Sequence, residues 1–266
     1  MSARAAAFFD LDGTLLPLPS LERQFFRMLR YRRETPLTNY LLWWREALKL
    51  LPRGIGAVAH GNKMYLRGVR SFEESGAGKQ SYSRAHASGH QSEGRPSMPP
   101  KHNPRWPVPP FFEDGVERVA WHAMQEHALM IVSGTLEPLA NAAAQTLEME
   151  LAGRGIVAGI RVCATKLEES DGRWTGRIIG EAMFGRAKAR AIVSLAEEMH
   201  LDLSKSWAYG DTPQDRWMLA SVGNPAAVNP TPRLARIAWK QGWSILRTTH
   251  RVQQTRKLLQ HAERCP

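Results

Sequence analysis

The sequence Ala5-Ala-Ala-Phe-Phe-Asp-Leu-Asp-Gly-Thr14 joins a short apolar run to two closely spaced carboxylates. An uninterrupted apolar run is typical of a strand that is buried on both faces of a parallel sheet. Residues two apart at a strand end point to the same side, so Asp10 and Asp12 are both predicted to face a ligand beyond the sheet. Gly13 permits a backbone turn that residues with a Cβ rarely adopt.

Two such carboxylates suit either a divalent metal ion of the Mg²⁺ type or a nucleophile beside a general acid/base. A calcium-binding EF-hand loop is excluded, because one that began at Asp10 would need glycine in place of Leu15 and glutamate in place of Leu21. A solvated acidic turn remains an alternative explanation for this short motif taken alone.

The same strand pattern recurs along the chain, in alternation with segments of helical periodicity. Short apolar runs occupy residues 128–132, 206–209, 226–228 and 243–246, and helices are expected over residues 136–149, 187–199, 214–222 and 232–239. This alternation predicts an α/β fold with a doubly wound, mostly parallel sheet. Ligands bind such sheets at the carboxyl ends of the strands, so the chemistry is expected there.

Three further polar features follow predicted strands. Ser133 is expected to open a helix, where its hydroxyl and the helix-start N–H groups would face an anion. Lys188 falls in the first turns of the next helix, and Asp211 and Asp215 come directly after another apolar run. Each feature has a simpler explanation when taken alone: an N-cap serine, a solvated lysine and an N-cap aspartate.

Residues 17–70 are predicted to form a helical cap inserted after the first strand, because their apolar residues have helical spacing among arginines. The basic, tryptophan-bearing helix of this cap suits contact with an anionic membrane surface, although packing against a neighbouring helix is the simpler explanation. Residues 71–110 hold seven prolines and seven serines but no Leu or Ile, and are expected to be disordered. They are either a flexible insertion in the cap or a segment whose reading frame differs from that of its relatives.

The chain has 266 residues, 43% hydrophobic residues and a formal net charge of +11. This apolar content is enough to bury a core, and the charge favours anionic partners such as phosphates, nucleic acid or an acidic membrane surface. Nucleic-acid binding is not expected, because no recognised motif accompanies the basic C-terminal helix or tail at residues 249–266. Two cysteines make a disulfide framework unlikely, and no apolar run reaches the roughly 20 residues of a membrane span, so a cytoplasmic protein is expected.

Four motifs occur in a fixed order, each at a predicted strand end or helix start: Asp10-Leu-Asp12, Ser133, Lys188 and Gly210-Asp-Thr-Pro-Gln-Asp215. In this order and setting the chain resembles the haloacid dehalogenase (HAD) superfamily. Residues 164–176, 184–185 and 222–230 resemble its phosphoserine phosphatase-like branch, which has a helical cap after the first motif. The resemblance implies a HAD-like catalytic core over residues 1–16 and 111–248.

The resemblance also implies a role for each motif. Asp10 would attack phosphorus and form an aspartyl-phosphate, and Asp12 would protonate the leaving group and later deprotonate the attacking water. Mg²⁺ would be bound by Asp10, the backbone carbonyl of Asp12, Asp211 and Asp215. The phosphoryl oxygens would be held by Ser133 and Lys188, with Thr14 and Gly134 in the same pocket.

The function implied is Mg²⁺-dependent hydrolysis of a phosphomonoester, with a small phosphorylated metabolite or a lipid phosphate as substrate. A phosphate-binding or regulatory protein with impaired turnover is the alternative. A preference for phosphoserine is not expected, because Pro19 stands where phosphoserine phosphatases usually carry a glutamate, and Glu22 is out of register. The sequence predicts neither the particular substrate nor the oligomeric state.

Overall fold

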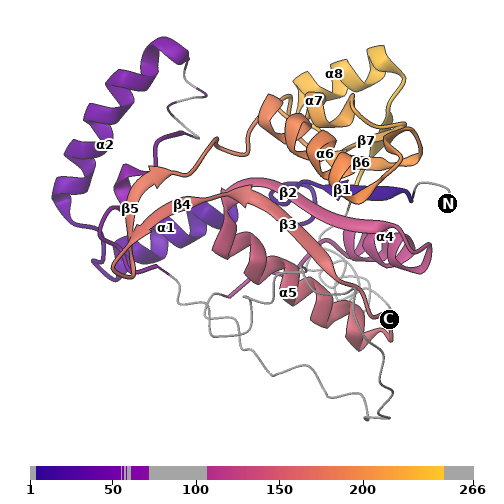
Figure 1. Cartoon of the computed structure of the whole chain (residues 1–266), viewed down its shortest axis with the longest axis horizontal. Coiled ribbons are helices and arrows are strands. Elements are labelled where there is room, and N and C mark those ends of the chain that lie inside the picture. Colours follow the sequence, from indigo (N-terminus) through magenta and orange to yellow (C-terminus); the bar gives the residue numbers. More distant parts are fainter. Residues whose placement is uncertain (1–3, 55, 57, 59–60, 72–106, 249–266) are drawn as a thin grey trace, which may run out of the picture.

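The structure is a computed structural model that describes residues 4–54, 56, 58, 61–71 and 107–248 (Figure 1). The predicted disordered insertion at residues 71–110 lies almost wholly outside these described residues, and the basic tail at residues 249–266 lies outside them entirely. Both expectations therefore stay predictions.

A six-stranded sheet forms the centre of the fold, with its strands in the order β3-β2-β1-β6-β7-β8. Every neighbouring pair in this sheet is parallel. The predicted α/β fold with a doubly wound parallel sheet is thus confirmed. The strands are β1 (Ala6–Phe9), β2 (Ala128–Leu136), β3 (Ile160–Thr165), β6 (Trp207–Gly210), β7 (Asn224–Val228) and β8 (Ser244–Leu246).

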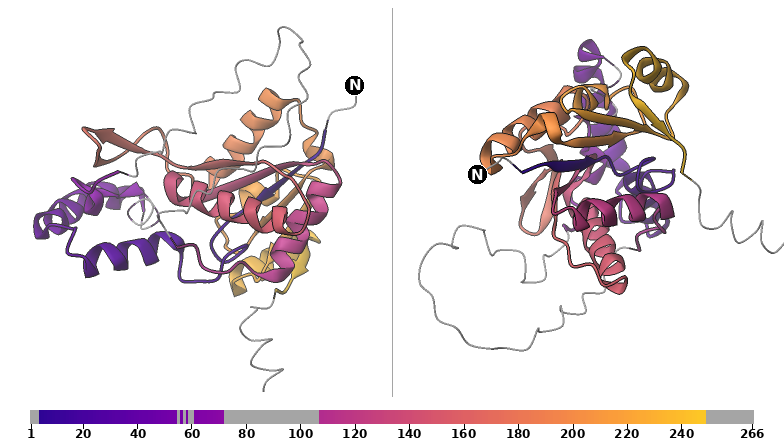
Figure 2. Two further views of the ribbon diagram at one scale, coloured as in Figure 1. Left: turned by 90° about the horizontal axis from the view of Figure 1, so that it is seen from below. Right: turned by 90° about the vertical axis from the view of Figure 1, so that its right-hand side faces the viewer.

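Helices cover both faces of the sheet, as Figure 2 shows. One face carries α4 (Glu113–Met124) and α5 (Glu137–Gly153), and the other carries α6 (Arg186–Met199), α7 (Arg216–Leu219) and α8 (Pro232–Gln241). The side chains of β1 alternate between the two cores: Ala7 and Phe9 pack on the first face, Ala6 and Phe8 on the second. Burial on both faces explains why the strand is apolar throughout.

The segment after β1 forms helices that project from one end of the sheet (Figure 1). They are α1 (Leu21–Tyr31) and α2 (Leu37–Leu50), followed by the short 3₁₀ turns η1 (Leu51–Arg53) and η2 (Met64–Leu66). The buried face of α1 consists of Leu21, Phe25 and Leu29. These helices lie where the sequence predicts a cap. None of the described helices combines the length and the apolar character that crossing a membrane requires.

A β-hairpin that the sequence analysis did not predict completes the cap. Its strands β4 (Leu167–Ser170) and β5 (Arg173–Ile178) are antiparallel. Gly68 N donates to Trp174 O at 2.8 Å, and Trp174 N donates to Val69 O at 2.9 Å. The buried Trp174 ring packs edge-on against Phe25 of α1, with 5.9 Å between the ring centroids. The cap is therefore built from two distant parts of the chain, one of which lies within the range predicted for the core.

The structure corrects two predicted helices and adds a strand. Ser133 does not open a helix, because β2 continues through it to Leu136 and α5 begins only at Glu137. The extension of β2 follows from its pairing with β3, in which Thr165 is in register with Leu136. The helix predicted over residues 214–222 is shortened to the four residues of α7. Strand β3 itself was not predicted, because most of its side chains are only half-buried and its pattern is weak.

A histidine is buried between α4 and the sheet. His122 Nε2 lies 2.8 Å from the hydroxyl of Tyr209, and its Nδ1 lies 2.8 Å from Nδ1 of His127. Burial lowers the pKa of His122 to about 3, and the charges of His127 and Arg118 act in the same direction. The folded protein therefore keeps this imidazole neutral over a pH range in which the unfolded chain protonates it.

We predict that His122 reduces stability in mild acid. Below the ordinary pKa of 6.5 the unfolded chain binds a proton that the folded protein does not bind until about pH 3. The free energy of unfolding therefore falls as the pH is lowered through this window, by on the order of 1 kcal/mol per pH unit. Urea unfolding at about pH 7 and about pH 5 measures this loss, which should be smaller in His122→Gln than in the wild type.

His200→Asn is the matched control, because it replaces an exposed histidine and should leave the wild-type pH dependence unchanged. His200 lies in the left-handed region with φ 53°, a conformation that asparagine tolerates. The prediction would be contradicted if the free energy of unfolding fell equally on acidification in His122→Gln and in the wild type.

Candidate active site

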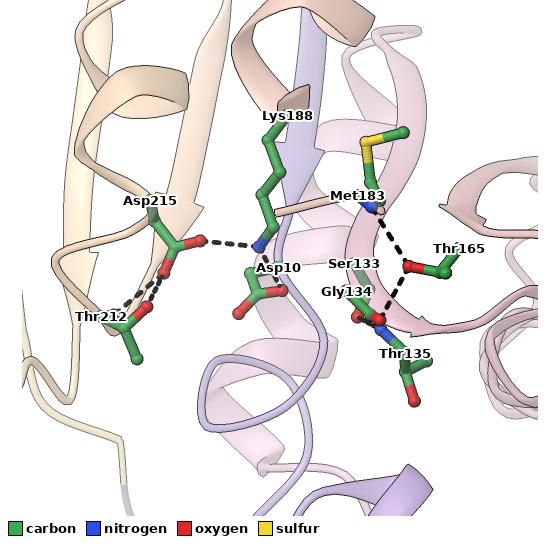
Figure 3. A network of polar contacts seen from close by, with 9 residues as sticks. All are labelled: Asp10, Ser133, Gly134, Thr135, Thr165, Met183, Lys188, Thr212 and Asp215. Atoms are coloured by element: carbon green, nitrogen blue, oxygen red, sulfur yellow. Dashed lines mark hydrogen bonds and ion pairs between the residues drawn. The ribbon is translucent and has the colours of Figure 1, made fainter. Parts of the chain in front are cut away.

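The carboxyl ends of three adjacent parallel strands meet at one edge of the sheet. The predicted site residues at these ends are Asp10 after β1, Ser133 and Gly134 in β2, and Asp211 and Asp215 after β6. Lys188, in the first turn of α6, extends into the same space, as the close-up in Figure 3 shows. Residues that are far apart in the sequence thus form one group.

Three buried carboxyl groups share this edge with one ammonium group. Asp10, Asp211 and Asp215 each offer a carboxylate oxygen within 4.8 Å of the other two. Lys188 Nζ donates to Asp10 Oδ1 at 2.7 Å and to Asp215 Oδ1 at 2.6 Å (Figure 3). All four side chains are buried, so bulk water screens their charges poorly. In their ionised forms, three negative charges face one positive charge.

Burial and mutual repulsion raise the pKa values of two of these acids. Burial raises the pKa of Asp10 to about 7; the ammonium of Lys188 opposes this shift, and the charge of Asp215 adds to it. Burial, together with the charges of Asp10 and Asp215, raises the pKa of Asp211 to about 9. Burial acts to lower the pKa of Lys188, but the two aspartates that it contacts raise it overall. At neutral pH the cluster therefore retains a proton unless a cation takes its place.

Two glycines are needed where the backbone passes close to these aspartates. Gly13 has a φ of +87°, and a Cβ at this position would lie 2.2 Å from Asp211 Oδ2. A Cβ at Gly210 would lie 2.5 Å from the Cβ of Asp215. Neither distance is sterically tolerable. The approach of the loop after β1 to Asp211 therefore requires glycine at position 13, and the turn that brings Asp215 back over the end of β6 requires glycine at position 210.

Asp12 faces the cap. Its Oδ1 accepts a hydrogen bond from the backbone N–H of Leu21, the first residue of α1, at 2.7 Å. Burial raises the pKa of Asp12 to about 6; the hydrogen bond from Leu21 opposes this shift, and the charge of Glu22 adds to it. A carboxyl group with such a pKa gains and loses a proton readily near neutral pH, which suits a general acid/base.

A cavity of about 700 Å³ connects these groups to the cap. Its floor includes most of the residues that the sequence predicts for the chemistry: Asp10, Asp12, Ser133, Gly134, Lys188, Asp211 and Asp215. Thr14 is the exception, since it is buried but does not line the cavity. The structure thus brings together every predicted site residue except Thr14.

Three threonines of the site gave no signal of spacing or periodicity in the sequence. Thr135 and Thr231 line the cavity, and their hydroxyl oxygens are buried without a hydrogen-bond partner in the described part of the chain. Thr165 Oγ1 donates to Gly134 O at 2.9 Å and accepts from Met183 N at 3.1 Å, so it fixes the end of β2 (Figure 3). Since an unpaired buried hydroxyl is costly, the first two mark a place for polar ligand atoms.

The acid cluster fits a hard divalent cation such as Mg²⁺. Its donors are carboxylate oxygens, which Mg²⁺ prefers. Asp211 Oδ1 is buried and has no hydrogen-bond partner among the described residues. Asp215 is held in place, since its Oδ2 accepts from the N–H and the hydroxyl of Thr212 at 2.9 and 2.7 Å. The cluster therefore offers one oriented carboxylate and one free carboxylate oxygen to a cation.

Comparison with known proteins gives the family. The sequence model of the haloacid dehalogenase-like hydrolases matches residues 7–220, and the chain belongs to this family. Phosphoserine phosphatase SerB1 of Mycobacterium tuberculosis is 43% identical over 81 residues, which make up 30% of this chain and 26% of that protein. The chain thus matches only about a quarter of the length of this curated relative.

Solved structures share the fold. A protein of Bordetella pertussis Tohama I, described as having unknown function, is similar with a TM-score of 0.60 and 23% identity, over 92% of this chain and 99% of that one. A phosphoserine phosphatase structure with an analogue of the phospho-aspartyl intermediate has a TM-score of 0.52 and 15% identity, over 97% and 99% of the two chains. These similarities confirm the predicted HAD-like fold.

Lys188 is predicted to stabilise the folded state. Lys188→Met leaves Asp10 and Asp215 buried without their cation, and removing one partner of a buried ion pair costs about 3–5 kcal/mol. Urea unfolding in EDTA near neutral pH measures the loss. Lys205→Met is the matched control, because Lys205 pairs with Asp202 at the surface at 3.4 Å, and water and salt screen such exposed pairs. Equal stability of Lys188→Met and the wild type would contradict the prediction.

Proposed function

We propose that the protein is a Mg²⁺-dependent phosphomonoester hydrolase that works through an aspartyl-phosphate on Asp10. The observation that carries the proposal is the position of the Asp10 carboxylate. It lies at the cavity floor, hydrogen-bonded to Lys188 and within 4.8 Å of two further acids. A nucleophile, a cation that neutralises phosphoryl charge and a metal site thus meet at one point. Membership of the hydrolase family and the relative named as a phosphatase support the proposal.

The two aspartates of the first motif carry the reaction. A carboxylate oxygen of Asp10 attacks phosphorus, the P–O bond to the alcohol breaks, and Asp12 gives its proton to the departing oxygen. Asp12 then takes a proton from water, whose oxygen attacks the same phosphorus and breaks its bond to Asp10. Inorganic phosphate leaves, and both aspartates return to their starting forms. One difficult displacement is thereby replaced by two easier ones, and the pKa of Asp12, about 6, suits both proton transfers.

The remaining residues of the floor bind and neutralise the phosphoryl group. Lys188 and the hydroxyl of Ser133 contact its oxygens, with the backbone N–H of Gly134 beside them. Thr14 remains a proposed member of this set, although it does not line the cavity. The metal ligands are Asp10, the backbone carbonyl of Asp12, Asp211 and Asp215. Mg²⁺ bound there supplies positive charge that offsets the charge of the phosphate.

A phosphate-binding protein without turnover is the second candidate function. Phosphate binding alone would need the cavity, Ser133 and Lys188, whereas the chain also places Asp10 and Asp12 at the floor, both with raised pKa values. Perturbed acids of this kind are typical of catalytic sites, which favours hydrolysis. The proposed substrate is a small phosphorylated metabolite or a lipid phosphate, and the proposed location is the cytoplasm.

Asp10→Asn is expected to abolish hydrolysis and to leave the fold intact, because an amide does not attack phosphorus. We expect kcat for a generic aryl phosphate to fall by at least about 10³-fold. EDTA should reduce wild-type turnover to a similar level, and added Mg²⁺ should restore it. Asp171→Asn is the matched control, because Asp171 is exposed in the β4–β5 turn with a φ of 53°, where asparagine is tolerated. Undiminished turnover in Asp10→Asn would contradict the proposed mechanism.

A further inference from the structure

The part of the cavity that faces the cap has an aromatic wall. We define this wall as Phe26, Tyr40, Trp43, Trp44, Tyr65 and Phe184, all of which line the cavity. Phe26 packs edge-on against two of the others, with centroid distances of 4.8 Å to Tyr65 and 6.4 Å to Tyr40. Trp43 and Trp44 pack against each other in the same way at 5.4 Å. The surface that faces away from the catalytic floor is thus largely apolar.

The polar groups on the cap side of the cavity are already paired with one another. Glu22 accepts hydrogen bonds from Lys63 Nζ and from the hydroxyl of Tyr65. Lys63 is only 2% exposed, and the Glu22 carboxylate neutralises its ammonium group. The ammonium and carboxylate of an amino acid would need partners when buried here. Because Glu22, Lys63 and Tyr65 already pair with one another, few polar groups on this side remain to bind the ammonium and carboxylate of an amino acid.

The charge on the cap side does not suit a cationic ligand either. Aromatic side chains bind quaternary ammonium groups well. Beside the aromatic wall, however, Arg23 and Lys63 supply two positive charges against the one negative charge of Glu22. The aspartates that also line the cavity lie at its floor. A ligand cation in contact with the aromatic wall would be repelled by this excess of positive charge. A neutral apolar group meets no such penalty.

We propose that the aromatic wall binds the alcohol part of the substrate, and that this part is a bulky, uncharged, apolar group. The inference rests on the proposed hydrolysis of phosphomonoesters at Asp10. A cavity of about 700 Å³ falls in the range that encloses a whole drug-sized ligand, so it has room for such a group beyond the phosphate. Aromatic rings also provide large contact areas and favourable edge-on packing for another ring. The substrate class is thus the phosphomonoester of a large apolar alcohol.

The test compares wild-type kcat/KM for 2-phenylethyl phosphate and ethyl phosphate. Both are esters of primary alcohols, so the chemistry at phosphorus is matched and only the apolar group differs. Burial of the phenyl ring should raise kcat/KM by about tenfold or more. Equal values would overturn the inference and leave the hydrolase function intact. A preference for phosphoserine or for phosphocholine over the phenylethyl ester would also overturn it.

Trp43→Ala tests the wall itself. The substitution should lower kcat/KM for the phenylethyl ester more than for the ethyl ester and remove most of the preference. Trp239→Ala is the matched control, because Trp239 lies on α8, is 78% exposed and does not line the cavity. If Trp43→Ala does not fold, the comparison of kcat/KM for the two esters with the wild-type protein still tests the inference.

A binding experiment distinguishes failure of the inference about the aromatic wall from failure of the proposed hydrolase function. If no ester is hydrolysed at all, the hydrolase proposal fails. Calorimetry with 2-phenylethylphosphonate and ethylphosphonate then tests the wall without turnover. Binding of the phenylethyl compound that is tighter by about tenfold supports the inference, and equal binding overturns it.

A second observation concerns an exposed apolar stripe on the cap, which adjoins the aromatic wall at Trp44. It consists of Leu37, Leu41, Trp44, Leu48 and Leu51, which are 84, 72, 62, 66 and 55% exposed. The spacing of four, three and four residues places the first four within about 60° of arc around the axis of α2, and Leu51 follows directly after this helix. In the part of the chain that the structure describes, this stripe is solvent-exposed over its whole length. Figure 1 shows that α2 lies at the far end of the cap from the sheet.

Basic residues are exposed on both helices of the cap. Arg45 and Lys49 lie beside the stripe on α2, and Arg27 and Arg30 are exposed on α1. Residues 21–53 contain eight Lys and Arg residues against three Glu residues. An exposed apolar stripe with basic flanks is the pattern of a surface that lies in the interface of an anionic membrane.

We propose that this side of the cap contacts an anionic lipid surface, with the stripe among the lipids and the arginines at the head groups. Charge complementarity favours this occupant. A second copy of the chain would bring two basic surfaces together, which costs free energy. The lipid surface, in contrast, gains from every basic side chain near it.

Vesicle sedimentation tests this second proposal with the full chain. The wild type should bind vesicles of phosphatidylcholine mixed with phosphatidylglycerol and should not bind phosphatidylcholine alone at moderate salt. The double variant Leu41→Gln, Leu48→Gln should bind at least about tenfold more weakly. The double variant Met124→Gln, Met149→Gln is the matched control, because it changes exposed apolar residues on α4 and α5.

Two outcomes would overturn the lipid proposal. One is that the wild type does not bind the anionic vesicles. The other is that the double variant Leu41→Gln, Leu48→Gln binds these vesicles as tightly as the wild type. If binding is absent and light scattering detects a dimer that dissociates in this variant, the stripe belongs to an interface with a second copy of the chain.

Discussion

The burial of three carboxyl groups against one lysine is the constraint around which the site is built. Removing an ionised carboxylate from water is costly, and Lys188 offsets only part of that cost. The rest is relieved by raised pKa values at Asp10 and Asp211, or by a cation that binds between the acids. The arrangement that weakens the fold is therefore also the one that is compatible with a bound cation. Such a cluster is characteristic of function, because apolar residues would stabilise the same volume better.

The parallel sheet explains how these groups reach one another. Strand β1 lies between β2 and β6, so Asp10 has Ser133 and Gly134 of β2 on one flank and Asp211 and Asp215, after β6, on the other. The alternation along β1 fixes this position, because Ala7 and Phe9 fill one core while Ala6 and Phe8 fill the other. A shift of one residue would exchange the two faces and displace Asp10 from the cavity. The position of Asp10 is thus determined by core packing.

The sequence predicts features whose pattern is local, such as Asp10 after an apolar run. It does not predict features that depend on distant contacts. Ser133 lies in a strand because β3 pairs with the chain beyond it, and the short β4–β5 hairpin is ordered by hydrogen bonds to residues 68–71. Thr165 acts through two backbone groups, one of them on another strand. The aromatic residues of the cap have ordinary helical spacing, which does not reveal that they face a cavity.

One hydrogen bond couples the cap to the catalytic floor. Leu21 N, at the start of α1, donates to Asp12 Oδ1 at 2.7 Å. Burial raises the pKa of Asp12 and this bond lowers it, and burial is the larger effect. The net effect favours the protonated carboxyl group, which is the form that protonation of a leaving group requires. Helix α1 also carries Phe26, so the helix that donates to Asp12 also supplies part of the aromatic wall of the same cavity.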